Sequence, residues 1–171
     1  MIVSILVGAL ALSFMQETPP APTDPAASVD PQAAAAAPAA PSSGEEWQRV
    51  AATERRGYLA DVSSIQAVAD GVTNLTAALV PRGNVEAGDQ SHTLESYAFR
   101  CRADQFRVPL SREVGPDGQV TDSYDDSASD WSPIPASGLP RYLKDMACEN
   151  ARSTKPPFPT IAAYVEAGRP E

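Results

Sequence analysis

Two cysteines, Cys101 and Cys148, offer the clearest chemistry in this chain. A zinc site would need further ligands, yet the chain has one histidine, His92, and no CxxC pattern. Two alternatives are left: a disulfide, or a reactive thiol that could act as a nucleophile. Cys101 follows Tyr97 and Phe99 in an apolar alternation, where thiols are usually inert. We therefore expect a Cys101–Cys148 disulfide.

Other residues that could do acid–base or metal chemistry form weaker patterns. His92 follows Ser91, but adjacent residues rarely serve each other as nucleophile and base, so we expect a polar surface role. An acidic cluster could offer oxygen ligands to calcium, yet it lacks the D-x-D-x-D-G spacing, so we expect a solvated loop. Its members are Asp122, Asp125, Asp126 and Asp130. Neither pattern predicts a metal or a cofactor. They support one alternative function, a small periplasmic hydrolase or an enzyme inhibitor.

Three arginines form the best candidate contact surface. Arg100, Arg102 and Arg107 should share the outer face of neighbouring strands, although such a stripe can also serve to prevent aggregation. The chain carries a net charge of −9, which argues against binding to nucleic acid or to anionic membranes. We expect the partner to be a protein or another component of the cell envelope.

The first 44 residues predict export. Residues 2–15 are apolar or small, too short a run to span a membrane but typical of a signal peptide, assigned here to residues 1–16. Residues 17–44 contain 10 Ala, 7 Pro and no aromatic residue, which predicts a disordered linker. We expect the mature protein to lie outside the cytoplasm, in the periplasm or at the cell surface, with no stable membrane span after cleavage of the signal.

The remaining chain must position the candidate residues, and its pattern predicts an α+β domain. Alternating residues and turn signals predict six short strands that form an antiparallel meander with one buried face. The expected strands are 47–51, 58–61, 72–80, 93–102, 106–111 and 119–124. Pro109 fits an edge strand or an outward-facing bulge, and residues 115–118 (GPDG) predict a hairpin turn.

A helix is expected to cover this sheet. Ser137 is its predicted N-cap, and an apolar stripe follows at helical spacing. The stripe consists of Leu139, Leu143, Met146 and Ala147. On an ideal helix Cys148 lies nearly opposite Leu139, so we expect the helix to end near Ala147 and to free Cys148 for the disulfide.

The C-terminal residues predict little structure of their own. Residues 156–159 (PPFP) cannot be helical, whereas residues 160–167 could form one or two helical turns. Such turns would place Ile161, Tyr164 and Val165 on one side. We expect a domain over residues 45–150 and a loosely attached tail over residues 151–171.

The order of landmarks resembles the surface-adhesin protein E-like family over about residues 45–150. The landmarks are Trp47-x-x-Val50, Tyr58-x-x-Asp61-x-x-Ser64-Ile65, Cys101, Gly118-x-Val120, Trp131-x-x-Ile134 and Leu143-x-x-x-Ala147-Cys148. The resemblance implies a six-stranded antiparallel sheet with the C-terminal helix held on its concave face by the disulfide. It also implies an adhesin-like binding domain that can form a homodimer. We therefore expect a non-enzymatic binding domain of the bacterial cell envelope, with an unidentified ligand.

Overall fold

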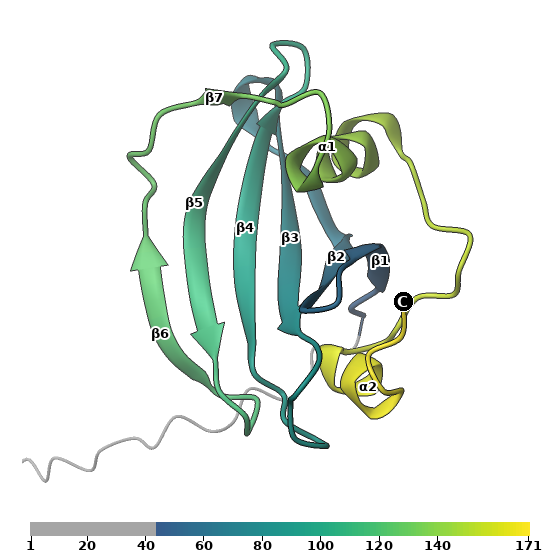
Figure 1. The fold of residues 1–171 in the computed structure, drawn as a ribbon. Coiled ribbons are helices and arrows are strands. Elements are labelled where there is room, and N and C mark those ends of the chain that lie inside the picture. Colours follow the sequence, from purple (N-terminus) through teal and green to yellow (C-terminus); the bar gives the residue numbers. More distant parts are fainter. Residues whose placement is uncertain (1–43) are drawn as a thin grey trace, which may run out of the picture. The chain divides into compact units, whose positions relative to one another are not determined.

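The computed structural model describes residues 44–171, and the predicted signal peptide and nearly all of the predicted linker lie outside these residues. Six strands form one antiparallel sheet in sequence order, and a two-residue strand, β7, also pairs with β5 (Figure 1). The strands are β1 (Trp47–Ala52), β2 (Arg56–Ala67), β3 (Val72–Pro81), β4 (His92–Arg100), β5 (Gln105–Val114), β6 (Val120–Asp125) and β7 (Ser132–Pro133). Two helices follow, α1 (Leu139–Glu149) and α2 (Ile161–Glu166). The predicted meander and its C-terminal helix are confirmed, whereas β7 was not predicted.

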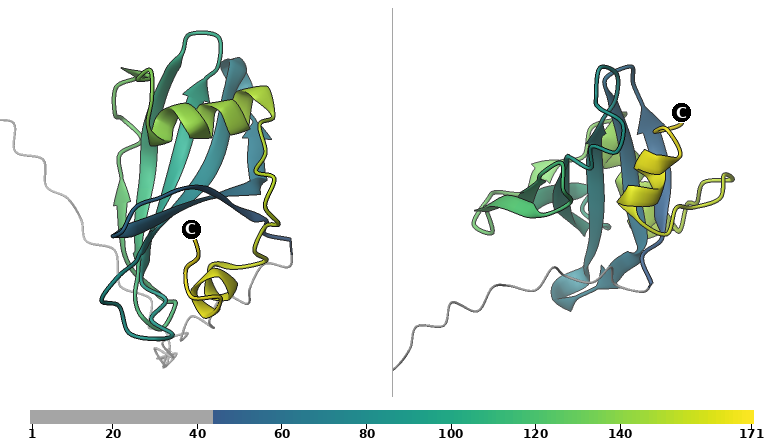
Figure 2. Two further views of the ribbon diagram at one scale, coloured as in Figure 1. Left: turned by 45° about the vertical axis from the view of Figure 1, so that its right-hand side comes forward. Right: turned by 90° about the horizontal axis from the view of Figure 1, so that it is seen from below.

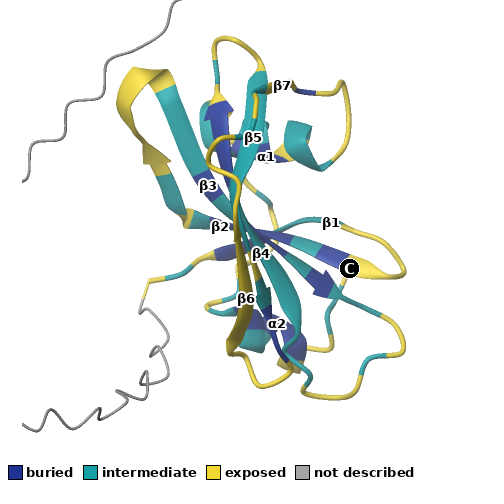
Figure 3. Ribbon diagram, turned by 90° about the vertical axis from the view of Figure 1, so that its left-hand side faces the viewer, coloured by how far each residue is buried: buried dark blue, intermediate teal, exposed yellow. Residues whose placement is uncertain are grey.

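The centre of the sheet is buried on both faces, so the expectation of one buried face is wrong. Consecutive strand residues point to opposite faces, yet Ala77 and Ala78 of β3 are both buried, at 1% and 0% exposed. Their neighbours on β2, Ala60 and Leu59, are fully buried too. Figure 3 shows this burial in β2 to β4, in contrast to β6, whose residues are all exposed. Each face must therefore have its own cover.

Helix α1 covers the first face and runs across the strands (Figure 2). Its buried residues Leu143 and Met146 join Leu75, Tyr97 and Phe99 in one apolar cluster. The rings of Tyr97 and Phe99 are stacked with centroids 5.9 Å apart. The period-2 alternation that placed these two aromatic residues on one face is therefore confirmed, and the predicted helical stripe packs against them.

Helix α2 covers the opposite face, so the expectation of a loosely attached tail is wrong. Tyr164 is 1% exposed and packs with Leu59, Ala78 and Val80 in a second apolar cluster. Gly57 permits this packing, because a Cβ at that position would lie 2.2 Å from the Tyr164 hydroxyl. The predicted one-sided arrangement within α2 is confirmed, since its buried residues are Ile161, Tyr164 and Val165.

The part of the tail between α1 and α2 binds to the edge strand β1. Trp47 and Phe158 exchange two main-chain hydrogen bonds of 2.9 Å, which form an isolated bridge beside β1. The side chain of Gln48, 5% exposed, accepts a hydrogen bond from the Ser153 main-chain N–H at 2.9 Å. The tail thereby supplies partners for an edge strand that would otherwise present unpaired backbone groups.

Strand β2 is far longer than the predicted strand 58–61, because it continues through an irregular stretch. Its register with β3 shifts between Asp61 and Gln66. The Ser64 hydroxyl fills the gap, accepting from the Thr76 main-chain N–H at 2.8 Å and donating to the Asp61 carbonyl at 2.6 Å. The buried Asp61 carboxylate accepts hydrogen bonds from the Glu46 and Ser63 main-chain N–H groups. Sequence alternation did not reveal this stretch because polar residues interrupt it.

Strand β5 contains the predicted irregularity at Pro109. Its register with β4 shifts so that Val108 and Pro109 together oppose Tyr97, which defines a β-bulge. Pro109 lacks an N–H, and the bulge places it where the ladder does not need one. The predicted hairpin turn is also present, since the Gly118 N–H donates to the Gly115 carbonyl at 2.9 Å.

The disulfide between Cys101 and Cys148 is present, with an S–S distance of 2.02 Å and a Cα–Cα distance of 5.7 Å. Cys101 lies in the β4–β5 turn rather than in the strand predicted over residues 93–102. The expectation that α1 ends near Ala147 is wrong, because the helix continues to Glu149 and ends at Asn150 in the left-handed conformation. Cys148 therefore bonds from within the helix, and both cysteines pack against the first apolar cluster.

The predicted N-cap of α1 is also wrong. Gly138, not Ser137, occupies this position, and no side chain caps the helix. The main chain has a φ of 102° there, which glycine adopts at little cost. Pro140 in the first turn has a fixed φ that suits the start of a helix. The chain can therefore turn sharply from the buried Ile134 into α1.

Removing the disulfide should lower the free energy of unfolding. A link across 47 residues restricts the unfolded chain, and its loss through Cys101→Ala/Cys148→Ala should cost about 4 kcal/mol. Urea denaturation of the oxidised protein and of this variant measures the difference. Thiol titration in denaturant without reductant is the control, and two free thiols per chain in protein isolated from cells would contradict the assignment.

The packing of α2 predicts a large effect at Tyr164. Tyr164→Ala should lower the free energy of unfolding by about 3–5 kcal/mol, because it opens a cavity in the second apolar cluster. Tyr142→Ala is the matched control on α1, where the side chain is 50% exposed, and should change the value by less than about 0.5 kcal/mol. Urea denaturation measures both variants, and equal effects would show that the tail does not pack as described.

Candidate functional site

Two of the three predicted arginines lie together beside an aromatic ring. Arg100 ends β4 and Arg107 lies on β5, and their register places both on the same face of the sheet. Their guanidinium carbons lie 4.1 Å and 4.8 Å from the ring centroid of Trp131. A cation against an indole ring is attracted by the negative face of the ring. Arg107 also donates to the Ser127 carbonyl at 2.9 Å, so it helps to hold the β6–β7 connection.

Arg102 lies apart from this stack, so the expectation that all three arginines share one strand face is wrong. It is an exposed residue of the β4–β5 turn, because β4 ends at Arg100. The period-2 alternation was extended past the true end of the strand, and this produced the error. Arg100 and Arg102 nevertheless meet at a different feature, a hollow between two hairpin tips.

The hairpin-tip hollow has a volume of about 490 Å³ and lies between the β2–β3 turn and the β4–β5 turn. Its apolar lining includes Val68 and Val72, and Val68 is 41% exposed. Arg100 and Arg102 contribute positive charge to its lining, and Asp70 contributes one negative charge. The hollow therefore combines an apolar wall with a net positive charge.

The arginine charges at the hollow are not paired with carboxylates. Within residues 44–171 the ion pairs shorter than 4.0 Å are formed by Arg82, Arg141 and Lys144, and none involves Arg100, Arg102 or Arg107. Guanidinium groups bind carboxylate and phosphate oxygens through a planar fork of N–H donors. Arg102 is therefore available to an anionic ligand, and Arg100, although it lies against Trp131, has no carboxylate partner.

The β4–β5 turn that carries Arg102 is held in place from two directions. Cys101 joins it covalently to α1, and Thr73 Oγ1 of β3 lies 3.6 Å from Cys101 Sγ. Asp104 accepts two hydrogen bonds from the Arg141 guanidinium, at 2.9 Å and 3.2 Å. The wall of the hollow is consequently fixed to both the sheet and the helix.

His92 and the acidic cluster, which were considered for acid–base chemistry, do not form a common site. His92 is half-buried at the start of β4, with Nδ1 2.6 Å from the Gln90 carbonyl oxygen, so the expectation of a surface position is only partly met. The four aspartates of the acidic cluster are exposed on β6 and the connection after it. Asp125 accepts a hydrogen bond from the Ser127 main-chain N–H, and hydrogen bonds from Ser127 lower the pKa of Asp125. In the described part of the chain, no three His, Cys, Asp or Glu side chains gather closely enough to bind a metal ion.

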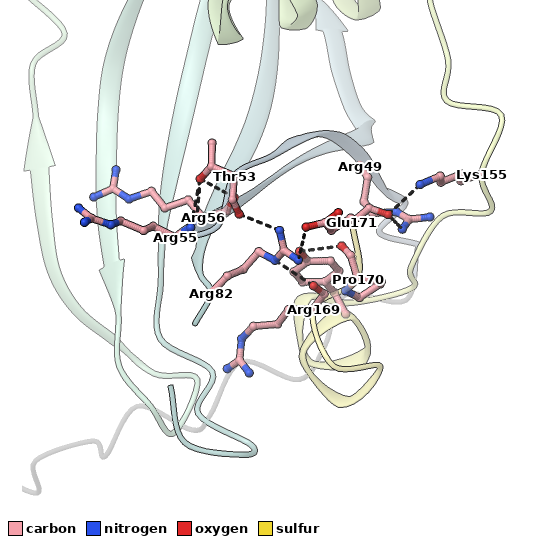
Figure 4. Close-up of polar contacts among 10 residues, drawn as sticks. Arg49, Thr53, Arg55, Arg56, Arg82, Lys155, Arg169, Pro170 and Glu171 are labelled. Atoms are coloured by element: carbon pink, nitrogen blue, oxygen red, sulfur yellow. Dashed lines mark hydrogen bonds and ion pairs between the residues drawn. The ribbon is translucent and has the colours of Figure 1, made fainter. Parts of the chain in front are cut away.

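Sequence reasoning missed a second group of cations, which we call the basic cluster. Its members come from β1, the β1–β2 turn, the start of β2, the residue after β3 and the tail, so only the fold brings them together. They are Arg49, Arg55, Arg56, Arg82, Lys155 and Arg169. Figure 4 shows that Arg49, Arg82 and Lys155 bond to Glu171, whereas the side chains of Arg55 and Arg56 point away from it. The cluster holds six of the 13 basic residues of the chain. One feature of the sequence could have indicated a clustering of cations: every basic residue follows Gly44.

Comparisons with known proteins leave the family open. No family model, no curated protein and no solved structure matches the chain. Among the helices of residues 44–171, none has the length and apolar character needed to cross a bilayer.

The burial of His92 predicts a pH dependence of stability. Burial lowers the pKa of His92 below its usual value of 6.5, against opposing effects of the Gln90 carbonyl and of Glu113 and Glu45. The unfolded chain therefore binds a proton more readily than the folded chain, and stability should fall as the pH falls below about 6.5. Urea denaturation at about pH 7.5 and about pH 5.5 measures this loss. His92→Gln should reduce it, and an undiminished loss in that variant would assign the effect to other groups.

Proposed function

We propose that residues 44–171 form a non-enzymatic binding domain of the bacterial cell envelope that docks its partner at the hairpin-tip hollow. One observation carries this proposal: Arg100 and Arg102 lie at an apolar hollow of about 490 Å³, with no carboxylate of the described residues within 4.0 Å of them. A guanidinium group without a carboxylate partner beside apolar surface favours a ligand that can supply a carboxylate or phosphate.

The chemistry of the hollow suggests the kind of partner that it fits. Val68 and Val72 offer apolar contact, and the two guanidinium groups offer recognition of a carboxylate or phosphate. A protein segment or an envelope component with an anionic group beside an apolar group satisfies both requirements. A second copy of this chain is one such partner.

The disulfide supports the proposed location outside the cytoplasm. Disulfides persist in oxidising compartments and are rare in the reducing cytosol, and the predicted signal peptide is consistent with the same location. The surface-adhesin protein E-like resemblance supports a binding role, with α1 on the concave face of the sheet. The hydrolase alternative required His92 or the acidic cluster to line a shared pocket, and the separation of these residues gives it no support.

Site-specific photo-crosslinking in cells that produce the full chain tests the proposal. A photo-reactive residue in place of Val68, within the hollow, should yield a discrete adduct with an envelope component. The same residue in place of Val120, which is 56% exposed on β6, is the control for general surface contact. An adduct of twice the chain mass identifies a second copy as the partner.

Charge reversal at the hollow should abolish this adduct. Arg102→Glu should reduce its yield at least about tenfold, since an anionic group would then face a carboxylate. Arg112→Glu is the matched control, because Arg112 is exposed on β5 and does not line the hollow. An adduct that persists undiminished in Arg102→Glu, or that forms equally from position 120, would rule out the hollow as the docking site.

A further inference from the structure

Strand β6 forms one end of the sheet, and its outer edge is open (Figure 1). The Asp126 N–H donates to the Pro109 carbonyl at 2.9 Å, and bonded pairs recur at every second residue of an antiparallel ladder. The main-chain groups of Ser123 and Asp125 therefore point away from β5. Among residues 44–171, β6 pairs with no strand other than β5. The edge thus offers main-chain donors and acceptors to another extended chain.

The two ends of the sheet differ in this respect. At β1, Trp47 and Phe158 exchange main-chain hydrogen bonds, so the tail of the chain supplies a partner. At β6 every residue is exposed, and the sequence VTDSYD contains neither proline nor lysine, two residues that often block exposed edges. The charged side chains that β6 does carry are aspartates.

Carboxylates lie on both faces of the sheet beside this edge. Asp122 and Asp126 flank Tyr124 on one face, and Asp125 lies on the other. The register places Asp122 directly opposite Glu113 of β5, and like charges at such a pair destabilise a sheet. Within the described part of the chain, none of these carboxylates forms an ion pair shorter than 4.0 Å. A cation bound beside β6 would relieve this repulsion.

This charge determines which strand the edge can accept. Pairing of two β6 strands would bring the three aspartates of each copy onto one ribbon, which like-charge repulsion disfavours. A strand with lysine or arginine beside Asp122 and Asp126 gains attraction instead. The residue between these two cations meets the ring of Tyr124, which is 58% exposed. One face of the edge therefore matches a cation, an apolar residue and a cation at alternate positions.

We propose that the outer edge of β6 binds a cationic, extended polypeptide segment as an additional strand of the sheet. The segment bonds to the main-chain groups of Ser123 and Asp125, and its cations lie beside Asp122 and Asp126. The edge shares no residue with the lining of the hairpin-tip hollow, so the two sites can fail or succeed independently.

Titration of the full oxidised chain with a synthetic peptide, followed by NMR, tests this proposal. The lysine probe, acetyl-TKTVTKT-amide, has the cation–apolar–cation pattern and should shift the β6 amide signals at concentrations up to about 1 mM. Its affinity should fall as salt is added. A probe with glutamate in place of lysine, and a lysine probe that is N-methylated at its two central threonines, should each bind at least about tenfold more weakly.

Variants of β6 separate main-chain pairing from charge. Ser123→Pro removes an N–H that faces away from β5, so it should weaken binding of the lysine probe at least about tenfold while the sheet tolerates it. Ser123→Ala keeps this N–H and should change the affinity less than about twofold. Asp122→Asn/Asp126→Asn should weaken binding at least about fivefold, whereas Glu86→Gln/Glu166→Gln removes the same charge elsewhere and should weaken it less than about twofold.

Each part of the proposal can be overturned separately. Equal binding of the lysine and glutamate probes, or no binding of the lysine probe, would overturn the cationic partner. Undiminished binding of the N-methylated probe would overturn strand addition, even if Ser123→Pro does not fold. Self-association of the chain without a probe, lost in Ser123→Pro but retained in Ser123→Ala, would assign the edge to a second copy and overturn the proposal.

Discussion

Cys101 and Cys148 join the β4–β5 turn to the last turn of α1, and the first face of the sheet depends on this link. Helix α1 has 11 residues and no side-chain N-cap, and a helix of that length is marginal in water by itself. Its helical state therefore depends on packing against the sheet. The covalent bond, together with the ion pair between Arg141 and Asp104, keeps the helix close enough for that packing to persist.

The disulfide also fixes the position of the β4–β5 turn, which forms part of the hairpin-tip hollow. Because the β4–β5 turn is fixed to α1, Arg102 projects from a rigid support rather than from a free hairpin tip. Arg100 is placed by the sheet and by its contact with Trp131. A ligand that binds between these side chains thus meets a main chain that is already ordered, and less conformational entropy is lost when it binds.

Local patterns in the sequence correctly predicted the features that depend on a residue and its immediate neighbours in the chain. Alternation placed Tyr97 and Phe99 on one face, and GPDG predicted a hairpin. The missing N–H of Pro109 predicted either an edge strand or a bulge, and the structure has the bulge. Alternation failed in β2 and β3, because alanines such as Ala60 and Ala77 fit either face and conceal the second one.

Such patterns could not predict the second buried face or the basic cluster, because both form between segments that are far apart in the sequence. Tyr164 lies over Gly57, more than a hundred residues away in the chain, and only the fold shows why a glycine is needed there. Arg49 and Lys155 likewise meet at Glu171 through the arrangement of β1 and the tail. The pairing of Arg100 with Arg107 was accessible from period-2 spacing, whereas their contact with Trp131 was not.

The bridge between Trp47 and Phe158 has a consequence for the order of folding. The first strand of the sheet is completed by a segment that is synthesised near the end of the chain, and Tyr164 fills the second cluster later still. Contacts between such distant segments form slowly, because a long loop must close before they contribute. The edge of the sheet at β1 and the second face therefore stay incomplete until the tail has been translated.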